Sequence, residues 1–425
     1  MKAIATRLFV WSAALLTAAS AQAASFRGLG DLPGGSFASV ATSVSSDGRV
    51  VAGYSSTTNG YEAVRWTAAT GLRGIGELPG GTYASFGNAI SADGTTIVGN
   101  SQSASGDQAF RWTEGTGMIG LGDLPGSSFL SFATGVSSNG AVVVGYSRSA
   151  ASGTRAEAFR WTVADGMIGL GDLAGGVFNS FAWGVSTDGS VIIGESSSAS
   201  SGNNSEAFRW TSAGMTGLGD LSGGLFQSIA YAISADGNVI AGYSVPTSGF
   251  HAAFRWTTTN GMTELGALPC DPWSIARATS RDGAMIVGDP QTGSGDCVFM
   301  WTAERGMRRL LDVLTNDYGL NLSGWTLRQA LAISQNGNVI VGWGINPAGQ
   351  TEGWIADLAP NVEIDRGASP VVISWSTNAA GFLLQQTPSL PAVWTYSTTT
   401  PAVLNNRYVL TNSGDGQRFF RLVKP

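Results

Sequence analysis

Short apolar runs alternate with small polar turns along almost the whole chain, and the same succession returns seven times. Each return opens with a Ser-x-Asp/Asn-Gly turn, continues with an apolar run such as VVAGYS or VIIGES, and reaches a Trp-containing run such as AFRWT. Because Asp-Gly and Asn-Gly tolerate positive φ, such a turn between two apolar runs predicts a β-hairpin. The turns are Asp47-Gly48, Asp93-Gly94, Asn139-Gly140, Asp188-Gly189, Asp236-Gly237, Asp282-Gly283 and Asn336-Gly337.

Each repeat predicts four antiparallel strands. In one of them, strands are expected at residues 129–137, 142–147, 158–162 and 168–173. Successive third strands carry a Trp every 45 to 53 residues, which is too long for one rung of a solenoid and fits a four-stranded sheet. The seven Trp residues are Trp66, Trp112, Trp161, Trp210, Trp256, Trp301 and Trp354.

The two ends of the repeat region complement each other. It begins with a lone fourth strand, residues 27–32, and it ends after a third strand, residues 353–358. An open stack would leave both as bare sheet edges, whereas in a ring the first strand completes the last sheet. We therefore predict an all-β fold: a seven-bladed β-propeller over residues 24–359, closed by its N-terminal strand.

Side-chain size along the first strands predicts how the sheets pack. One face carries small residues such as Ser131 and Ala133, and the other carries large ones such as Trp183 and Tyr231. We expect the bulky face of one sheet to pack on the small face of the next, with the seven Trp residues in the core between sheets. Recurrent Arg and acidic residues on adjacent strands are interpreted as structural ion pairs. They are Arg65, Arg111, Arg160, Arg209 and Arg255, with Asp31, Glu77, Asp123, Asp172 and Asp220.

The segments outside the repeats have characters of their own. Residues 1–23 resemble a secretory signal, with an apolar run between basic residues and a small-residue cleavage site. Residues 360–425 contain short alternating runs separated by Pro and Asn or Gly turns, which predict a small fibronectin-type or immunoglobulin-like β-sandwich. It would serve as a spacer, an anchor or a binding module. No other run is long enough for a membrane helix, so we expect an exported monomer without a membrane span.

The run AFRWT…GMIGLGDLPGG…SSNGAVVVGYS and the later NLSGWTLRQALAISQNGNVIVGWG resemble the HAF-repeat family of bacterial extracellular proteins. The similarity covers about residues 26–358. The resemblance implies export and a cell-surface or extracellular setting. The resemblance does not indicate a particular ligand or activity. Members of the family often end in a membrane-spanning sorting tail, and this chain has no such run at its C-terminus.

Charge and composition restrict the chemistry. The net charge is −6 and the basic residues form no stripe, so a nucleic-acid footprint is absent. With His251 as the one histidine, neither a multi-histidine metal site nor a catalytic triad is easily built. We expect no cofactor and no metal. In an oxidising compartment, Cys270 and Cys297 are expected to form a disulfide.

Loops of variable length, such as SRSAASGTRAE and SSSASSGNNSE, lie between the second and third strands, while the turns on the opposite face hardly vary. Variable loops on a rigid frame usually carry binding, although they also drift where nothing depends on them. One aromatic residue per repeat follows the fourth strand on this face, either to stack on a ligand or to fill the channel mouth. This first set is Phe37, Tyr83, Phe129, Phe178, Phe226, Trp273 and Trp325.

A second set directly follows the second-strand Gly, and its mixed polar and aromatic character suits recognition. Its members are Tyr54, Asn100, Tyr146, Glu195, Tyr243, Asp289 and Trp343. We predict a non-enzymatic protein that binds a carbohydrate or a protein partner through the loop-bearing face, or displays that face as a scaffold. The alternative is an extracellular hydrolase or lyase that acts on glycans through Glu195, Asp289 or Asp271.

Overall fold

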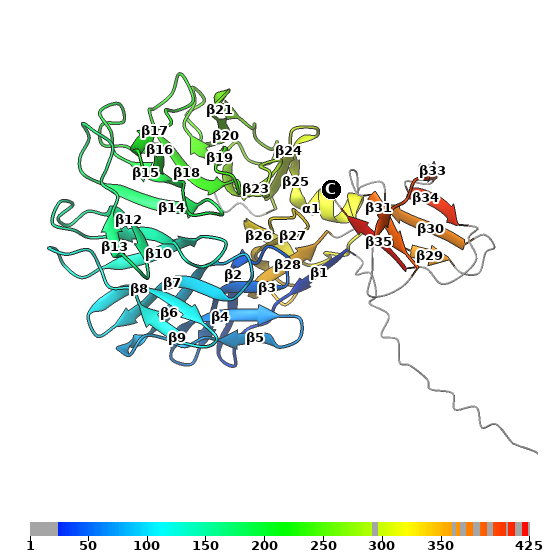
Figure 1. Ribbon diagram of the computed structural model, residues 1–425, viewed down its shortest axis with the longest axis horizontal. Helices are drawn as coiled ribbons and strands as arrows, with labels where there is room; N and C mark the ends of the chain where they lie inside the picture. Colours follow the sequence, from blue (N-terminus) through cyan, green and yellow to red (C-terminus); the bar gives the residue numbers. More distant parts are fainter. Residues whose placement is uncertain are drawn as a thin grey trace, which may run out of the picture. The chain divides into compact units, whose positions relative to one another are not determined.

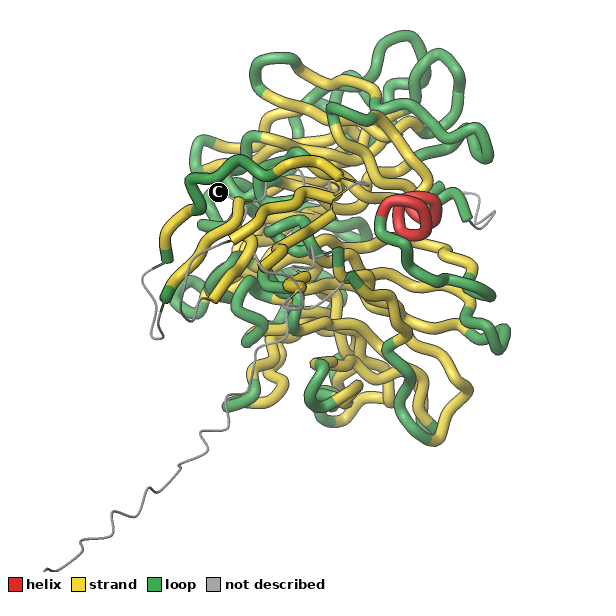
Figure 2. Tube along the Cα trace, turned by 90° about the vertical axis from the view of Figure 1, so that its right-hand side faces the viewer, coloured by secondary structure: helices red, strands yellow, loops and turns green. Residues whose placement is uncertain are grey.

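The computed structural model describes residues 24–290 and 296–358, and toward the C-terminus residues 363–365, 371–376, 383–388, 394–404, 407–412 and 419–423. The predicted signal, residues 1–23, lies outside the described residues. Strands dominate, and the expected all-β fold is confirmed (Figure 2). The described helical segments, α1 (Leu310–Asp312) and η1 (Val313–Asp317), are far too short to cross a membrane.

One compact unit spans Ala24–Leu358. Its described strands form seven groups of four. Two groups are β2 (Gly34–Val44), β3 (Val50–Thr57), β4 (Gly60–Thr67), β5 (Gly71–Gly74) and β6 (Gly80–Ile90), β7 (Thr96–Ser103), β8 (Gly106–Thr113), β9 (Gly117–Gly120). Two more are β10 (Ser131–Val136), β11 (Val143–Ser147), β12 (Glu157–Thr162), β13 (Gly166–Gly169) and β14 (Ser180–Val185), β15 (Ile192–Ser196), β16 (Glu206–Thr211), β17 (Gly214–Gly217).

The remaining groups follow the same order. They are β18 (Ser228–Ile233), β19 (Val239–Ser244), β20 (Ala252–Thr257), β21 (Gly261–Glu264); then β22 (Ile275–Thr279), β23 (Met285–Asp289), β24 (Phe299–Thr302), β25 (Gly306–Arg309); then β26 (Thr326–Ile333), β27 (Val339–Ile345), β28 (Thr351–Asp357) with β1 (Ser25–Gly28). Within each group the pairing is antiparallel, and single parallel bridges Ala38↔Thr351 and Tyr61↔Ala84 connect three groups into one larger sheet.

The N-terminal strand β1 pairs with the end of the unit. Phe26 lies opposite Ala356 and Gly28 lies opposite Trp354, in antiparallel register. The first strands of the groups contact one another in sequence, and β26 in turn contacts β2. Figure 1 shows the groups following one another around a common centre in chain order, which is a propeller-like arrangement.

The Ser-x-Asp/Asn-Gly turns are connected to one another at one end of this arrangement, which we call the turn end. Backbone N–H groups donate to the next turn's carbonyl over 2.9–3.1 Å, and the connected residues are Ser46, Ala92, Ser138, Thr187, Ala235, Arg281 and Gln335. The Gln335 side chain accepts a hydrogen bond from Ser46 Oγ and donates one to Ser138 Oγ, each over 3.3 Å. It therefore bridges the turn end.

Each turn is also locked internally, as the turn interpretation predicts. In the first repeat, Ser45 Oγ donates to Asp47 Oδ1 over 2.8 Å, and the Arg49 N–H donates to the same oxygen over 3.0 Å. The Val50 N–H donates to Ser45 Oγ over 3.0 Å. The turn residues therefore satisfy one another's hydrogen-bonding groups, which accounts for the recurrence of this sequence.

Buried side chains join neighbouring groups. Trp residues of the third strands pack in hydrophobic clusters that combine two successive groups, as Trp112 does with Val50 and Leu78. A buried serine adds hydrogen bonds: Ser131 Oγ donates to the Gly122 carbonyl over 2.6 Å and accepts from the Ala109 N–H over 2.9 Å.

The junction between the chain ends repeats this interface. Ser39 Oγ donates to the Gly30 carbonyl over 2.5 Å and accepts from the Gly353 N–H over 3.0 Å. The seam is therefore built like the other interfaces.

Two packing predictions are wrong. Among the described residues, none of the recurrent Arg residues forms an ion pair with the recurrent acids, which lie just after the fourth strands. Arg111 and Arg255 instead donate to the carbonyls of Gly140 and Gly283 in the following turns, and Arg160 contacts Asp165. In addition, Trp183 and Tyr231 are not confined to the core between sheets: both pack against a small cluster of Ile229, Tyr243 and Ile275, and both line the cavity described below. A backbone irregularity described below turns both toward the centre.

Strands of the C-terminal part, which form a separate compact unit, make two antiparallel sheets. One contains β29 (Glu363–Asp365), β30 (Val371–Ser376), β33 (Ala402–Leu404) and β34 (Arg407–Asn412); the other contains β31 (Leu383–Thr387), β32 (Thr395–Tyr396) and β35 (Phe419–Val423). A small core combines Ile373, Trp375, Leu384 and Leu410.

Candidate functional site

A one-residue bulge interrupts every first strand at the same place. In β10, Ala133 pairs with Gly145 and Gly135 pairs with Val144, so Thr134 has no partner in the ladder. A bulge of this kind re-aims the extra side chain. The equivalent residues, which we call the bulge residues, are Thr42, Asn88, Thr134, Trp183, Tyr231, Arg277 and Leu331.

The second-strand Gly makes the bulge possible. A Cβ atom on Gly145 would lie 1.9 Å from the Phe132 carbonyl oxygen, well inside any permitted contact. The same approach, 1.8–2.0 Å, occurs at Gly53, Gly99, Gly194, Gly242, Gly288 and Gly342. Glycine is therefore required where the bulged strand presses its carbonyl against its neighbour.

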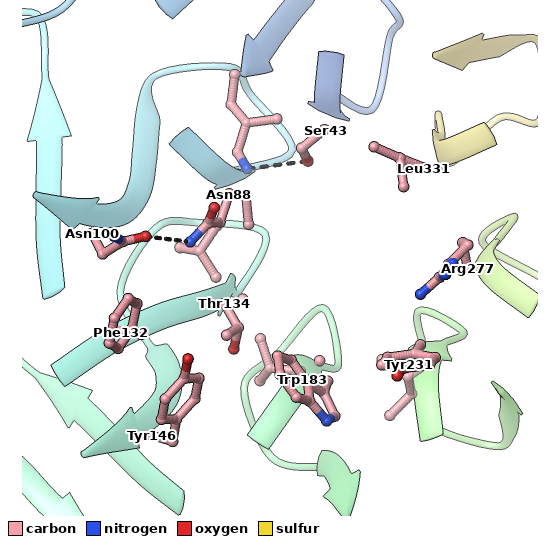
Figure 3. A pocket seen from close by; sticks show the side chains of 17 residues that line it. Ser43, Asn88, Asn100, Phe132, Thr134, Tyr146, Trp183, Tyr231, Arg277 and Leu331 are labelled. Atoms are coloured by element: carbon pink, nitrogen blue, oxygen red, sulfur yellow. Dashed lines mark hydrogen bonds between the residues drawn. The ribbon is translucent and has the colours of Figure 1, made fainter. Parts of the chain in front are cut away.

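A cavity of about 590 Å³ lies where the first strands converge (Figure 3). All bulge residues except Thr42 line it. Its size falls within the usual range for small-molecule sites. The cavity is therefore the candidate site.

One side of the cavity is aromatic. Phe132 and Tyr146 stack with ring centroids 5.0 Å apart, Tyr146 lies 5.9 Å from Trp183, and Trp183 lies 5.8 Å from Tyr231. We call these four residues the aromatic wall. Such rings offer flat apolar surface, and the Tyr and Trp members add a polar group each.

Amide and hydroxyl groups extend the lining toward β6 and β7. Asn88 Nδ2 donates to the Ala133 carbonyl over 2.9 Å and to Asn100 Oδ1 over 3.3 Å. Thr134 Oγ1 donates to the Ala182 carbonyl over 2.7 Å. Each of these bulge residues is thus held by the first strand of the next group. Figure 3 shows Asn88 and Asn100 side by side at this part of the lining.

An ion pair lies at the bulge of β22. Arg277 Nε and Nη2 donate to the two carboxylate oxygens of Asp289 over 3.0 and 3.3 Å, and Gln329 Nε2 donates to Asp289 Oδ1 over 3.1 Å. Trp343 Nε1 donates to Gln329 Oε1 over 2.7 Å. The Asp289 side chain is completely buried. Burial raises its pKa, and the Arg277 guanidinium opposes that rise.

Glu195 lies behind the aromatic wall. Its Oε1 accepts a hydrogen bond from Trp183 Nε1 over 3.2 Å. Burial raises the pKa of Glu195, and hydrogen bonds from Ser205 and Trp183 oppose the rise. This carboxyl group therefore orients the Trp183 ring.

Each member of the predicted second set lies twelve positions after a bulge residue. Tyr146 and Asn100 line the cavity. Glu195, Asp289 and Trp343 contact it through hydrogen bonds to lining residues or to Gln329. Tyr243 lies 6.1 Å from Tyr231, and Tyr54 lies 5.0 Å from Phe86.

The predicted first set lies elsewhere. None of its seven described members is among the residues that line the cavity. Tyr83 is 53% exposed, whereas Trp325 packs edge-on against Phe26 at 5.2 Å, and Trp273 contacts His251 at 4.6 Å. Phe37, Phe129, Phe178 and Phe226 are half-buried at the start of, or just before, the first strands. The structure does not bring these rings together.

Two further predictions concern the segment before β22. Asp271 Oδ1 accepts the Trp273 N–H over 2.9 Å, which is a local turn contact. Cys270 and Cys297 are joined by a disulfide, with their Cα atoms 6.2 Å apart. Among the described residues, no group of three or more His, Cys, Asp or Glu side chains is arranged to hold a metal ion.

Strict alternation of faces along the first strands does not predict that the bulge residues point into the cavity, because each bulge shifts the register by one residue. Two signals point to them. A Gly recurs in the interior of every second strand, and one first-strand position changes from Thr to Asn, Trp, Tyr, Arg and Leu between repeats.

No family model matches the chain, and no curated protein matches it. Among solved structures, it is similar to an oligogalacturonate lyase in complex with manganese, at 10% identity and a TM-score of 0.49, over 80% of this chain and 98% of that one. TolB from Acinetobacter baumannii has 13% identity and a TM-score of 0.39, over 72% and 79%. Hydrazine synthase from Kuenenia stuttgartiensis has 11% identity and a TM-score of 0.44, over 76% and 96%. These remote likenesses assign no function.

Proposed function

We propose that this protein is an exported, non-enzymatic carbohydrate-binding protein whose ligand enters the central cavity. The supporting observation is the composition of the lining: the aromatic wall faces a cavity that also presents the amides of Asn88 and Asn100. Sugars have apolar faces that stack on rings and hydroxyl groups that pair with amides. The export part of the proposal rests on the signal-like residues 1–23 and on the HAF-repeat resemblance.

The frame proposed for this site is a seven-bladed propeller closed by β1. Its support is the contact sequence of the first strands, in which β26 meets β2, and the pairing of β1 with β28. The Ser39 hydrogen bonds at the seam match those of Ser131 within the chain. A closed frame fixes the bulge residues around one centre, which a ligand site needs.

The glycan-acting enzyme is less well supported, because its proposed carboxylates are already engaged. Asp289 receives hydrogen bonds from Arg277 and Gln329, and Glu195 receives one from Trp183. Asp271 serves a backbone N–H. A general acid or base has to reach the substrate proton, whereas these three carboxylates are held by hydrogen bonds to other groups of the protein.

A glycan array probed with the protein lacking residues 1–23 tests the proposal. Binding sugars are then titrated against Trp183→Ala and Asn88→Ala, and each is expected to weaken binding at least tenfold. Tyr83→Ala is the matched control, since this exposed ring lies outside the cavity lining. Loss of binding in Tyr83→Ala with retention in Trp183→Ala would move the site to the loop-bearing face. Turnover of a bound glycan would establish the enzyme instead.

A further inference from the structure

We propose that the carbohydrate ligand is acidic and that Arg277 binds its carboxylate. This inference rests on the proposed function and names its ligand class. Among the described residues that line the cavity, Arg277 is the one charged side chain. A sugar carboxylate, as in a uronic acid, is the group that a fixed guanidinium recognises best within a carbohydrate.

The other repeats show that the fold itself does not need this ion pair. Each bulge residue is matched with the second-set residue twelve positions later, and no other bulge residue carries a charge. Asn88 pairs with Asn100 through an amide hydrogen bond, and Tyr231 packs near Tyr243. A buried ion pair is costly to desolvate and seldom gains stability over an apolar pair. A functional reason at the single position 277 is therefore favoured over a structural one.

The pair is oriented with its positive member toward the cavity. Asp289 has no exposed side-chain surface, whereas the Arg277 side chain is 23% exposed and lines the cavity. Nε and Nη2 of the guanidinium donate to Asp289, and a further hydrogen bond joins the guanidinium to the Tyr231 hydroxyl group. Since a guanidinium has five N–H donors, Arg277 can hold both partners and still offer donors to a ligand.

The surrounding residues hold the guanidinium still. Its central carbon lies 5.2 Å from the Tyr231 ring centroid, over the ring face. On the other side, Trp343 fixes Gln329, and Gln329 fixes the Asp289 carboxylate. An arginine immobilised before binding loses little conformational entropy when the ligand arrives. The carboxyl group of Glu195, behind the aromatic wall, accepts a hydrogen bond from Trp183.

Matched sugar pairs test the inference. Glucuronate, galacturonate and mannuronate are each titrated against the corresponding neutral hexose, using the wild-type protein without residues 1–23. We expect at least one uronate to bind roughly ten- to a hundredfold more tightly than its hexose, the range of one charge-assisted hydrogen-bond contact. In Arg277→Met this preference is expected to vanish. Arg49→Met, which removes a largely exposed charge, should keep it.

The outcomes separate the two proposals. If hexoses bind as tightly as uronates, or if Arg277→Met keeps the preference, the acidic-ligand inference is wrong and carbohydrate binding survives. If no sugar of either class binds here or on the array, the proposed function itself fails. Should Arg277→Met not fold because Asp289 is left buried without its partner, the double variant Arg277→Met/Asp289→Asn, which removes both charges of the pair, replaces it in the same titrations.

Discussion

Single glycines decide where the cavity wall can form. Wherever a second strand passes a bulge, a side chain would collide with a carbonyl oxygen of the first strand, as at Gly145 with Phe132. The residue that follows this Gly contacts the bulge residue of its own repeat in four repeats, at Asn100, Glu195, Tyr243 and Asp289. The repeat pattern therefore singled out the second set, of which Asn100 and Tyr146 line the cavity. The repeat pattern marks the residue after the second-strand Gly. The bulge in the first strand, in contrast, changes the direction of a side chain without leaving a recognisable alternation in the sequence.

Gly145→Ala should destabilise the protein strongly, because the added Cβ would lie 1.9 Å from the Phe132 carbonyl oxygen. We expect a loss of about 2–3 kcal/mol in the free energy of unfolding, measured by urea denaturation. Gly115→Ala is the control: nothing lies within 4 Å of its added Cβ, so a change within about 0.5 kcal/mol is expected. Equal losses in the two variants would contradict the close-approach account.

Asp188→Asn should change the acid sensitivity of the protein. The Ser186 hydroxyl, together with hydrogen bonds from Ser190, lowers the pKa of Asp188 from 3.8 to about 2. Because the folded pKa is depressed, the ionised carboxylate stabilises the fold above about pH 3.8, and this contribution is lost as the pH falls toward 2. Asparagine keeps the turn, as it does at Asn139 and Asn336.

Urea midpoints of the wild type and Asp188→Asn at pH 7 and near pH 2 measure this effect. The advantage of the wild type over the variant should shrink on acidification. A constant difference between the two proteins across this range would show that the carboxylate charge contributes nothing to the turn.

At the scale of elements, the strands and their order were largely predictable. The Asp-Gly turns, the apolar runs and the Trp period specify four strands per repeat, and the split repeat specifies that β1 and β28 pair. The predicted structural ion pairs were wrong, because the recurrence of an Arg in the sequence does not show whether its partner is a carboxylate or a backbone carbonyl. Arg111 and Arg255 donate to backbone carbonyls.

The N-terminal strand is held by aromatic contacts that can be removed. Phe26 lies 5.2 Å from Trp325 and 5.8 Å from Trp354, measured between ring centroids. Phe26→Ala should reduce the free energy of unfolding by about 2–3 kcal/mol, since this half-buried ring supports the seam. Leu72→Ala is the matched control, because Leu72 occupies the position in β5 that Phe26 occupies in β1. A smaller side chain is removed there, so a smaller loss of stability is expected. Unchanged stability in Phe26→Ala would argue that β1 is dispensable for the fold.

At the scale of the whole molecule, one covalent bond connects distant parts of the chain. The disulfide between Cys270 and Cys297 closes a loop with a sequence separation of 27 residues. Loop-closure entropy suggests a stabilisation of roughly 3.5 kcal/mol at most. The double variant Cys270→Ser/Cys297→Ser should therefore unfold at lower urea concentration, and added reductant should lower the wild-type midpoint toward it. If the urea midpoint of the wild type stays unchanged in reductant although both thiols are shown to be free, the disulfide does not stabilise the fold.

The Gln335 bridge and the backbone hydrogen bonds join the seven turns into one connected set at the turn end. If these contacts bar the proposed ligand at that end, it has to reach the bulge side chains past the segments between the second and third strands, which vary in length and composition. Those segments would then form the entry path. Lengthening or stiffening them should slow association and dissociation of the proposed ligand to a similar extent, with little change in its dissociation constant. For the proposed ligand, dwell time and selectivity would then depend on different parts of the chain, and a change in one need not alter the other.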